Sequence, residues 1–232
     1  MIQLMGWDSR VLGISVGKLP IADAEKCEMG SYDLLLARVP QQQSELVRQL
    51  ESHGFRYIAM DVTLQAAAKT ADISVKNPIW QVSRLSRSTP TFEIDGFVIE
   101  DSRLMLDPLC KNLLPEAFWD SVIREHCEEF ADIVLYATDD QNRLTGFISC
   151  LKTPKYLDLF LVAVHPRCQG AGLGSILIDH ALQLGDELGL PVTTSVIANN
   201  VRGFNFYLKH NFLVKGSEVI MHRWRDGGGH EH

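Results

Sequence analysis

Residues 161–175 read Leu-Val-Ala-Val-His-Pro-Arg-Cys-Gln-Gly-Ala-Gly-Leu-Gly-Ser, a pattern of strand, glycine-rich turn and helix start. The apolar first part predicts a buried strand that ends at Pro166. The glycines at 170, 172 and 174 let backbone amides converge without side-chain obstruction. Periodic apolar residues over 173–188 predict a helix, and its N-terminus adds unpaired N–H groups and a positive dipole end. The stretch therefore predicts a cradle for a phosphate or pyrophosphate.

Two other phosphate-binding motifs do not fit this loop. A P-loop needs Lys and then Ser or Thr after its last glycine, but Ser175 and Ile176 follow Gly174. The dinucleotide fingerprint Gly-x-Gly-x-x-Gly, begun at Gly170, needs its third glycine where Ser175 stands. That fingerprint also opens near the start of its unit, whereas this loop follows three predicted strands.

The loop and a second segment together resemble the GNAT superfamily of acyl-CoA-dependent N-acyltransferases. The run Gln169–Gly174 resembles the family signature Gln/Arg-x-x-Gly-x-Gly/Ala. The segment 200–212 is similar to the family pattern Asn-x-x-Ala-x-x-x-Tyr-x-x-x-Gly-Phe, with Asn200 and Tyr207 at the matching positions. Gly203 replaces the usual Ala, and Asn211 replaces the usual Gly. The resemblance covers about residues 95–224 and says almost nothing about the acceptor.

The resemblance implies acetyl-CoA as co-substrate, with no metal. It implies that the pantetheine arm pairs like an extra strand with the backbone of Val162, Ala163 and Val164, which requires a strand that splays from its neighbour. Asn200 is expected to hydrogen-bond the cofactor, to cap the helix, or both. The pyrophosphate is expected on the amides around Gln169, Gly170, Ala171, Gly172, Leu173 and Gly174, with Ser175 at the end of the run.

Amide formation needs an unprotonated amine, donors for the oxyanion and a proton for the departing thiolate. The resemblance places Tyr207 in the last role, because a phenol with a pKa near ~10 is protonated at neutral pH. The alternative is that Tyr207 only packs at the edge of the core, on the apolar side of an amphipathic helix. Asp158 is the candidate general base, since it lies four residues before Val162 on the same predicted strand and should share its face. An exposed Asp, Tyr156 or His165 as base, and water as base remain open.

The chain is predicted to be α/β, with a mixed central sheet of the GNAT type behind a smaller α/β domain. The linker-like segment 84–95 places the boundary, giving an N-terminal domain 1–92, a second domain 93–226 and a flexible tail 227–232. The tail histidines are read as solvated, although they could contact a metal. Predicted strands are 32–39, 55–64, 97–100, 133–138, 144–151, 156–164, 192–198 and 212–224, and predicted helices are 43–53, 115–130, 173–188 and 200–210.

A short internal echo links the two parts of the chain. Residues 50–55 and 207–212 both read as a helix end, a left-handed cap residue and an inward Phe. The cap residues are Gly54 and Asn211. Chance is one explanation, and a degenerate half of the same fold is the other.

Composition excludes several classes of protein. Among 232 residues, 46% are hydrophobic and 22% charged, an ordinary globular balance. The net charge of -7 argues against nucleic acid as the main partner. No apolar stretch is long enough for a membrane span, and the N-terminus lacks signal-peptide features. Five cysteines without a metal-type spacing favour a reducing cytoplasm.

The acceptor is the least determined part of the prediction. The opening residues 7–14 and the segment 50–64 resemble the sugar-nucleotide N-acetyltransferases of surface-polysaccharide synthesis, such as the dTDP-fucosamine acetyltransferases. This favours a nucleotide-linked amino sugar. A peptide or small-metabolite amine, or an acyl-CoA-binding regulatory protein without catalysis, are the alternatives. Exposed sheet edges near residues 212–224 predict a homodimer.

Overall fold

The computed structural model describes residues 1–26, 28–66 and 80–225. The strands are β1 Gln3–Leu4, β2 Val16–Leu19, β3 Leu34–Pro40, β4 Arg56–Ala66, β5 Ser83–Leu85, β6 Ile133–Thr138, β7 Leu144–Lys152, β8 Leu157–Val164, β9 Val192–Ile197 and β10 Leu213–Trp224. The helices are α1 Gly6–Leu12, α2 Ser44–Ser52, α3 Arg103–Leu106, α4 Pro108–Leu113, α5 Phe118–Glu125, α6 Leu173–Leu188 and α7 Val201–Lys209. Two short 3-10 segments, η1 Ile21–Lys26 and η3 Pro166–Cys168, and a π-helical turn, η2 His126–Phe130, connect them.

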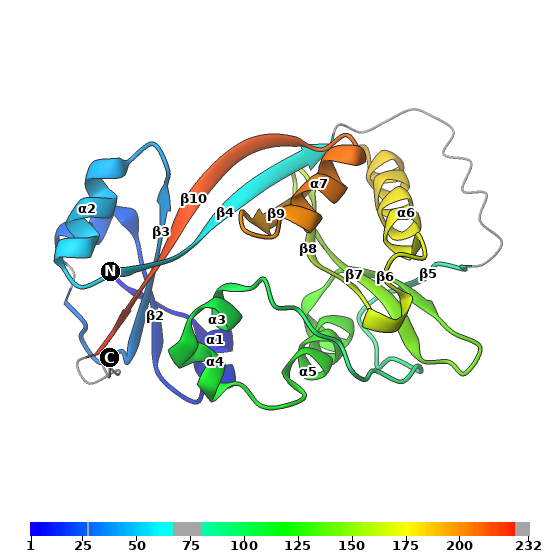
Figure 1. Ribbon diagram of the computed structural model, residues 1–232, viewed down its shortest axis with the longest axis horizontal. Helices are drawn as coiled ribbons and strands as arrows, with labels where there is room; N and C mark the ends of the chain where they lie inside the picture. The colour runs from blue at the N-terminus through cyan, green and yellow to red at the C-terminus, as the bar shows by residue number, and fades with distance from the viewer. Residues whose placement is uncertain (27, 67–79, 226–232) are drawn as a thin grey trace.

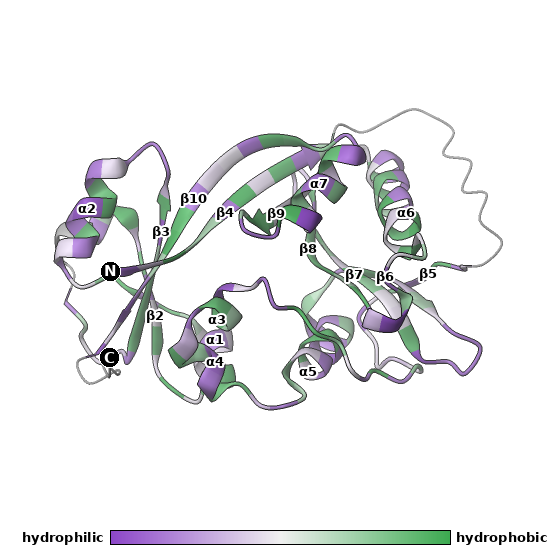
Figure 2. Cartoon of the chain, viewed as in Figure 1, coloured by the Kyte–Doolittle hydropathy of each residue, from purple (hydrophilic) through white to green (hydrophobic). Residues whose placement is uncertain are grey.

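One mixed sheet runs through the described part of the chain, in the order β1-β2-β3-β10-β4-β9-β8-β7-β6-β5. Figure 1 shows it along the length of the molecule, with α6 and α7 on the upper side and α3, α4 and α5 on the lower side. Side chains along each strand point alternately to the two helical layers. In β7, Ile148 packs with α6 and Phe147 packs on the side of α5. Figure 2 shows the same alternation as bands along β4 and β10. Among the described helices, none combines the length and apolar character needed to cross a bilayer.

The strand β10 lies inside the sheet, between β3 and β4, and is antiparallel to both. Trp224 pairs with Leu34 on one side, and Val219 pairs with Met60 on the other. In the described part of the sheet the outermost strands are β1 and β5. The expectation that β10 forms an exposed edge is therefore wrong, because the N-terminal strands cover both of its sides. The homodimer stays a prediction without that support.

The echo in the sequence corresponds to a repeated arrangement, β3-α2-β4 and β9-α7-β10, at a constant separation of 157 residues. The helices α2 and α7 begin at residues 44 and 201 and have nine residues each. Gly54 and Asn211 have φ of 87° and 61°, and a buried Phe follows each of them. The strand registers match as well, because residue 40 pairs with 218 and residue 197 pairs with 61. The last strand of each unit pairs with the first strand of the other, because β10 pairs with β3 and β4 pairs with β9. The axis that relates the two units lies near the pair Glu218–Asp61.

Most predicted elements are confirmed, and the helix 173–188 has the predicted bounds. The strand predicted at 97–100 is wrong: the amides of Gly96 and Phe97 both donate to the Asp120 carboxylate at 3.0 Å, which ties this segment to α5 as a loop. The helix predicted at 115–130 begins at Phe118 and changes to a π turn at His126. The domain boundary at 92/93 stays a prediction, and the tail 227–232 lies outside the described residues.

Candidate functional site

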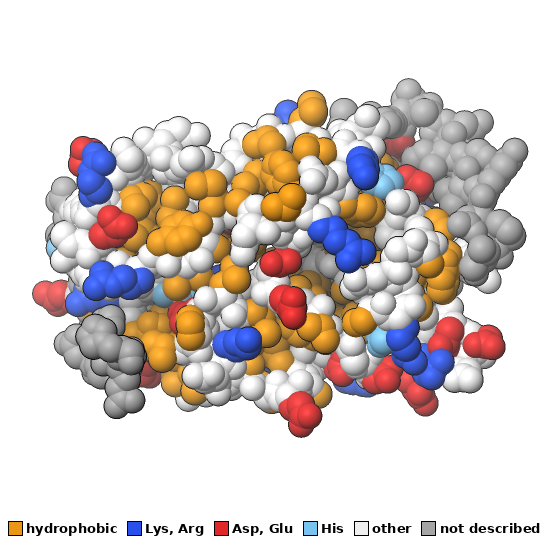
Figure 3. Space-filling model, viewed as in Figure 1, with side chains coloured by type: hydrophobic (Ala, Val, Ile, Leu, Met, Phe, Trp, Pro, Cys, Tyr) orange, Lys and Arg blue, Asp and Glu red, His pale blue; other side chains and the backbone are white. Residues whose placement is uncertain are grey.

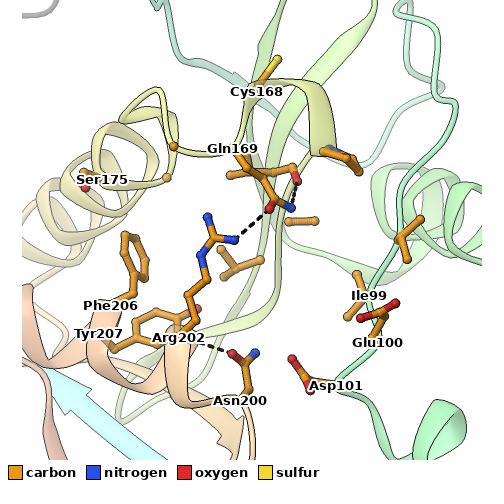
Figure 4. A pocket seen from close by; sticks show the side chains of 18 of the residues that line it. Ile99, Glu100, Asp101, Cys168, Gln169, Ser175, Asn200, Arg202, Phe206 and Tyr207 are labelled. Carbon is orange, nitrogen blue, oxygen red and sulfur yellow. Dashed lines mark hydrogen bonds between the residues drawn. The ribbon is translucent and has the colours of Figure 1, made fainter.

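A fork between β8 and β9 forms the centre of the site. These parallel strands pair only over Leu157–Leu159 and Val192–Thr194. Beyond this point β8 continues to Val164 with β7 on its other side, so its edge toward β9 carries no strand. A cavity of about 680 Å³ opens at the fork. Its walls come from β8, the glycine loop, α7 and the loop at residues 98–101 (Figure 4).

A β-bulge in β8 shapes the fork. Cys150 pairs with Leu159 and Ser149 pairs with Leu161, so Phe160 is an extra residue in the ladder. A bulge of this kind shifts the alternation of the strand by one position. After the bulge, different backbone groups face β9 than a regular strand would present.

The bulge corrects the prediction for Asp158. Leu157 and Leu159 pack toward α6, and Val162 and Val164 pack toward the same side after the bulge. Asp158 therefore lies on the opposite face from Val162, although the unbroken alternation predicted a shared face. Its carboxylate accepts a hydrogen bond from Thr193 at 3.0 Å. Burial raises the pKa of Asp158, the Thr193 hydrogen bond lowers it, and the Asp61 carboxylate raises it further.

The glycine loop has the backbone that an anion cradle requires. Gly170 and Gly172 have φ of 80° and 83°, and nothing lies within 4 Å of where a Cβ would be at either position. α6 begins at the next residue, so its first amides point out of the helix without intrahelical partners. The turn thus presents several N–H groups and the positive end of a sixteen-residue helix to the cavity.

The Gln169 side chain currently closes one side of the fork. Its Nε2 donates to the Val164 carbonyl at 3.2 Å, and its Oε1 accepts from Arg202 Nη1 at 3.1 Å (Figure 4). The first bond shows that the Val164 carbonyl faces the open side of β8. A ligand that pairs with this carbonyl has to displace the Gln169 amide.

Asn200 is the N-cap of α7, and its Oδ1 accepts the Gly203 N–H at 2.7 Å. A Cβ at position 203 would lie 2.8 Å from Asn200 Oδ1. Gly in place of the family's Ala therefore leaves room for this cap. The capping role predicted for Asn200 is confirmed, and its contact with a cofactor stays a prediction.

Tyr207 lies at the point where the fork begins. Its ring packs between Phe206 and Phe212, and the residue is only 6% exposed, yet it lines the cavity. The Tyr207 and Thr194 hydroxyls are hydrogen-bonded, and Thr194 donates to the Leu159 carbonyl at 3.0 Å. Burial raises the pKa of Tyr207 to about 12. The phenol is therefore protonated at neutral pH and can donate a proton.

Two acidic residues of the cavity were not found from the sequence. Glu100 and Asp101 line it and lie across from Asn200 and Arg202 (Figure 4). Figure 3 shows acidic side chains in the middle of this face of the molecule. Glu100 ends the segment 97–100, which the sequence predicted as a strand, and Asp101 follows that segment; both belong to a loop. Arg202 stands at an unspecified position of the family pattern, so that pattern gave no signal for it.

Most of the predicted site residues meet at the cavity, but three do not line it. Ala171 is exposed in the loop, and Asp158 lies on the other face of β8. The side chain of Leu173, the first residue of α6, points into the core. The other base candidates, Tyr156 and His165, are outside the cavity lining as well. The lining includes Val162, Ala163, Val164, Gln169, Gly170, Gly172, Gly174, Ser175, Asn200 and Tyr207. Their roles toward a ligand stay predictions.

One buried cluster in the described chain has side chains of metal-ligand type, Asp107, Cys110 and His222. These groups contact one another: His222 Nδ1 donates to Asp107 at 2.6 Å, and Cys110 Sγ lies 3.6 Å from the same carboxylate. Trp224 Nε1 also donates to it, at 3.0 Å. The cluster thus joins α4 to β10.

Two comparisons of sequence point to the same family. Residues 100–212 match the model of the acetyltransferase (GNAT) family. The peptidyl-lysine N-acetyltransferase YjaB of Salmonella typhimurium is 32% identical over 125 residues, which make up 53% of this chain and 70% of that protein.

Solved structures share the fold. A tandem GNAT protein from the clavulanic acid biosynthesis pathway superposes with a TM-score of 0.58 at 15% identity, covering 91% of this chain and 69% of that one. A GCN5-related N-acetyltransferase from Sphaerobacter thermophilus has a TM-score of 0.51 at 14% identity and covers 82% of this chain. The present chain spans only 59% of the length of the latter. The mixed α/β sheet predicted from the sequence is confirmed.

Proposed function

The chain belongs to the GNAT family of acetyltransferases, which use acetyl-CoA as co-substrate, and we propose that it transfers the acetyl group directly to a primary amine at the fork between β8 and β9. The observation that carries the proposal is that the free edge of β8, the glycine loop and Tyr207 line the same cavity. These three parts meet the needs of a thioester donor with a pyrophosphate and a leaving thiolate.

The residues of the fork fit acetyl-CoA, which supplies an activated thioester when bound. The backbone of Val162 and Val164 would pair with the pantetheine amides, once Gln169 has released the Val164 carbonyl. The amides around Gly170 and Gly172 would hold the pyrophosphate, helped by the positive end of α6. Ser175 and Asn200 line the same space.

In the proposed reaction the amine attacks the thioester carbonyl carbon, so that a C–N bond forms and the C–S bond breaks. The Tyr207 hydroxyl gives its proton to the departing sulfur, and the phenolate regains one from solvent. The excess proton on the amine passes to water, because Asp158 lies outside the cavity lining. A role for Asp158 as general base keeps only indirect support, through its raised pKa.

The acceptor class best supported by the cavity is a cationic amine, such as the side chain of lysine in a peptide or protein. Glu100 and Asp101 place negative charge at the cavity, which attracts an ammonium group and disfavours an anionic acceptor. The relative YjaB is named for action on peptidyl-lysine, which supports this class of acceptor.

A nucleotide-linked amino sugar is the second candidate. The match to YjaB covers only 53% of this chain, and the N-terminal half resembles sugar-nucleotide acetyltransferases in its opening residues.

Thiol release from acetyl-CoA, measured with a lysine peptide or with a dTDP-amino sugar, tests the proposal and separates the two acceptors. We expect turnover with the peptide and one added acetyl group by mass spectrometry. The double variant Glu100→Gln/Asp101→Asn should raise KM for the peptide and leave KM for acetyl-CoA unchanged. Turnover only with the sugar selects the second candidate. Tight binding of acetyl-CoA without thiol release from any amine would identify a regulatory binding protein instead.

Two finer expectations complete the proposal, a cytoplasmic location and a homodimer. The described cysteines 110, 127, 150 and 168 are free thiols, which supports a reducing compartment. Light scattering at micromolar concentration tests the dimer, and a monomer mass would contradict it.

A further inference from the structure

A buried histidine that plays no part in the proposed reaction lies directly behind the bulge in β8. His126 is 3% exposed and begins the π-helical turn η2 after α5. Its ring centroid lies 4.6 Å from that of Phe130 and 5.6 Å from that of Phe160, the bulged residue. π turns inside helices often occur at functional positions. His126 thus contacts the bulge from the side opposite α6.

One hydroxyl connects His126 to the backbone of β8. Ser149 Oγ is fully buried, accepts the Leu161 N–H at 3.1 Å and lies 2.9 Å from His126 Nδ1. A hydroxyl has one proton and two lone pairs, so it can accept from Leu161 and donate to a neutral imidazole. Burial lowers the pKa of His126 to about 4, which keeps the ring neutral at physiological pH. The three groups form one chain of hydrogen bonds.

The bond to Leu161 has a consequence for the open edge of β8. The bulge leaves Phe160 unpaired, and Leu161 is the first residue after it that pairs again with β7, opposite Ser149. The Ser149 hydroxyl accepts the Leu161 N–H at this point, so this N–H points toward β7. The next residue, Val162, then faces the fork, and so does the carbonyl of Val164 that Gln169 now occupies.

We propose that Ser149 and His126 are positioning residues, which hold the open edge of β8 in the orientation that binds acetyl-CoA. The inference rests on the proposed function, because it requires acetyl-CoA to pair with this edge. Neither side chain lines the cavity, so both act through Leu161.

The variant Ser149→Ala removes the side-chain acceptor of the Leu161 N–H and its connection to His126. We expect the dissociation constant for acetyl-CoA, measured by calorimetry, to rise roughly 10-fold to 100-fold. KM for acetyl-CoA should rise in parallel, whereas kcat at saturating acetyl-CoA should change by less than about threefold. Hydrogen exchange at the Leu161 amide should become faster.

Thr145→Val is the matched control. Thr145 lies on the same strand and is buried, and its hydroxyl donates to the Ala137 carbonyl at 3.0 Å, away from the bulge. This variant loses a comparable hydrogen bond and should lose a similar amount of thermal stability. Its affinity for acetyl-CoA should match the wild type, which separates a positioning role from a general loss of stability.

Two substitutions of His126 test the far end of the chain of bonds. His126→Asn keeps an acceptor for the Ser149 proton and should retain acetyl-CoA affinity within about threefold, whereas His126→Leu should weaken it about 10-fold. If Ser149→Ala does not fold, this pair decides the matter. Wild-type affinity in both folded Ser149→Ala and His126→Leu would overturn the inference. Failure of the wild type to bind acetyl-CoA would instead overturn the proposed function.

Discussion

The segments β2-β3-α2-β4 and β8-β9-α7-β10 have the same framework, but the fork with its cavity belongs to the second. In both, the parallel pair ends at equivalent positions, Leu19 with Ala37 and Leu159 with Thr194. After Leu19 the chain leaves the sheet at Pro20 and enters η1. After Leu159, β8 instead continues through its bulge and into the glycine loop. The difference teaches that the framework alone makes no cavity, because the extended edge of β8 and the glycine loop supply its lining.

Equivalent side chains of α2 and α7 also differ, being apolar or uncapped in α2 where α7 has polar groups at the cavity. Leu50 stands where α7 has Tyr207, and Gln43 stands where it has Asn200. Leu50 is 1% exposed and packs with Phe55 in an apolar cluster. The first segment therefore contributes packing, and the second combines packing with polar groups at the cavity.

The largest expected effect comes from making the second helix resemble the first. Tyr207→Phe keeps the ring between Phe206 and Phe212 but removes the proton donor. We expect the acetylation rate in single turnovers to fall by ~10²–10⁴, with little change in acetyl-CoA affinity. Tyr57→Phe, at an exposed tyrosine of β4, is the control. A change in KM alone would show that the Tyr207 hydroxyl serves binding only.

The two ends of α6 provide the next test. Gly172 and Gly189 have φ of 83° and 66°, and neither has an atom within 4 Å of a Cβ position. Glu at either site brings the same strain and charge, but only Gly172→Glu puts the carboxylate where the pyrophosphate would lie. We expect Gly172→Glu to weaken acetyl-CoA binding at least about 100-fold by calorimetry, and Gly189→Glu to leave it unchanged. Equal affinities would contradict the cradle.

Asp107 is hydrogen-bonded to His222 and Trp224 of β10, the strand of the second segment that lies between β3 and β4 of the first. Burial raises the pKa of Asp107, but hydrogen bonds from His222 and Trp224 outweigh it and bring the pKa to about 2. A carboxyl with a depressed folded pKa stabilises the fold above its unfolded pKa, and this stability is lost as pH falls toward the folded value. Burial lowers the pKa of His222, so its uptake of a proton on unfolding acts in the same direction.

We therefore expect the free energy of unfolding in urea to fall by up to about 2 kcal/mol from Asp107 between roughly pH 5 and pH 2. Asp107→Asn should be less stable at neutral pH and show a flatter profile over this range. If the free energy of unfolding has the same slope against pH in the variant and the wild type, Asp107 does not contribute to the pH dependence.

The smallest expected effect concerns the left-handed residues that end α2 and α7. Gly54 and Asn211 occupy equivalent positions, and Asn adopts positive φ more readily than other residues with a Cβ. Gly54→Asn should change the free energy of unfolding by less than about 0.5 kcal/mol, and Gly54→Ala should lower it by about 1 kcal/mol. Urea titrations measure both. Equal losses would mean that side-chain contacts at Gly54 matter more than φ.

The sequence was most informative where one local pattern determines the structure. The glycine run and the apolar stripe of α6 predicted that helix to the residue, and the helix start signal at Asn200 predicted its cap. The bulge at Phe160 could not be predicted, because a one-residue mismatch between two apolar strands leaves no mark on their composition. This bulge is the reason why the face predicted for Asp158 was wrong. Glu100 and Asp101 were missed because hydrogen bonds to a distant Asp120 hold their loop.

The placement of β10 was beyond reach for a related reason, since its pairing with β3 joins residues far apart in the chain. This placement has a consequence for synthesis. During translation β3 and β4 are made long before residues 213–224, and the strand that lies between them is missing until then. The N-terminal sheet cannot close in the order in which it is made. Its late, distant pairing favours slow folding, and a chain cut off before Leu213 presents two bare strand edges to other chains.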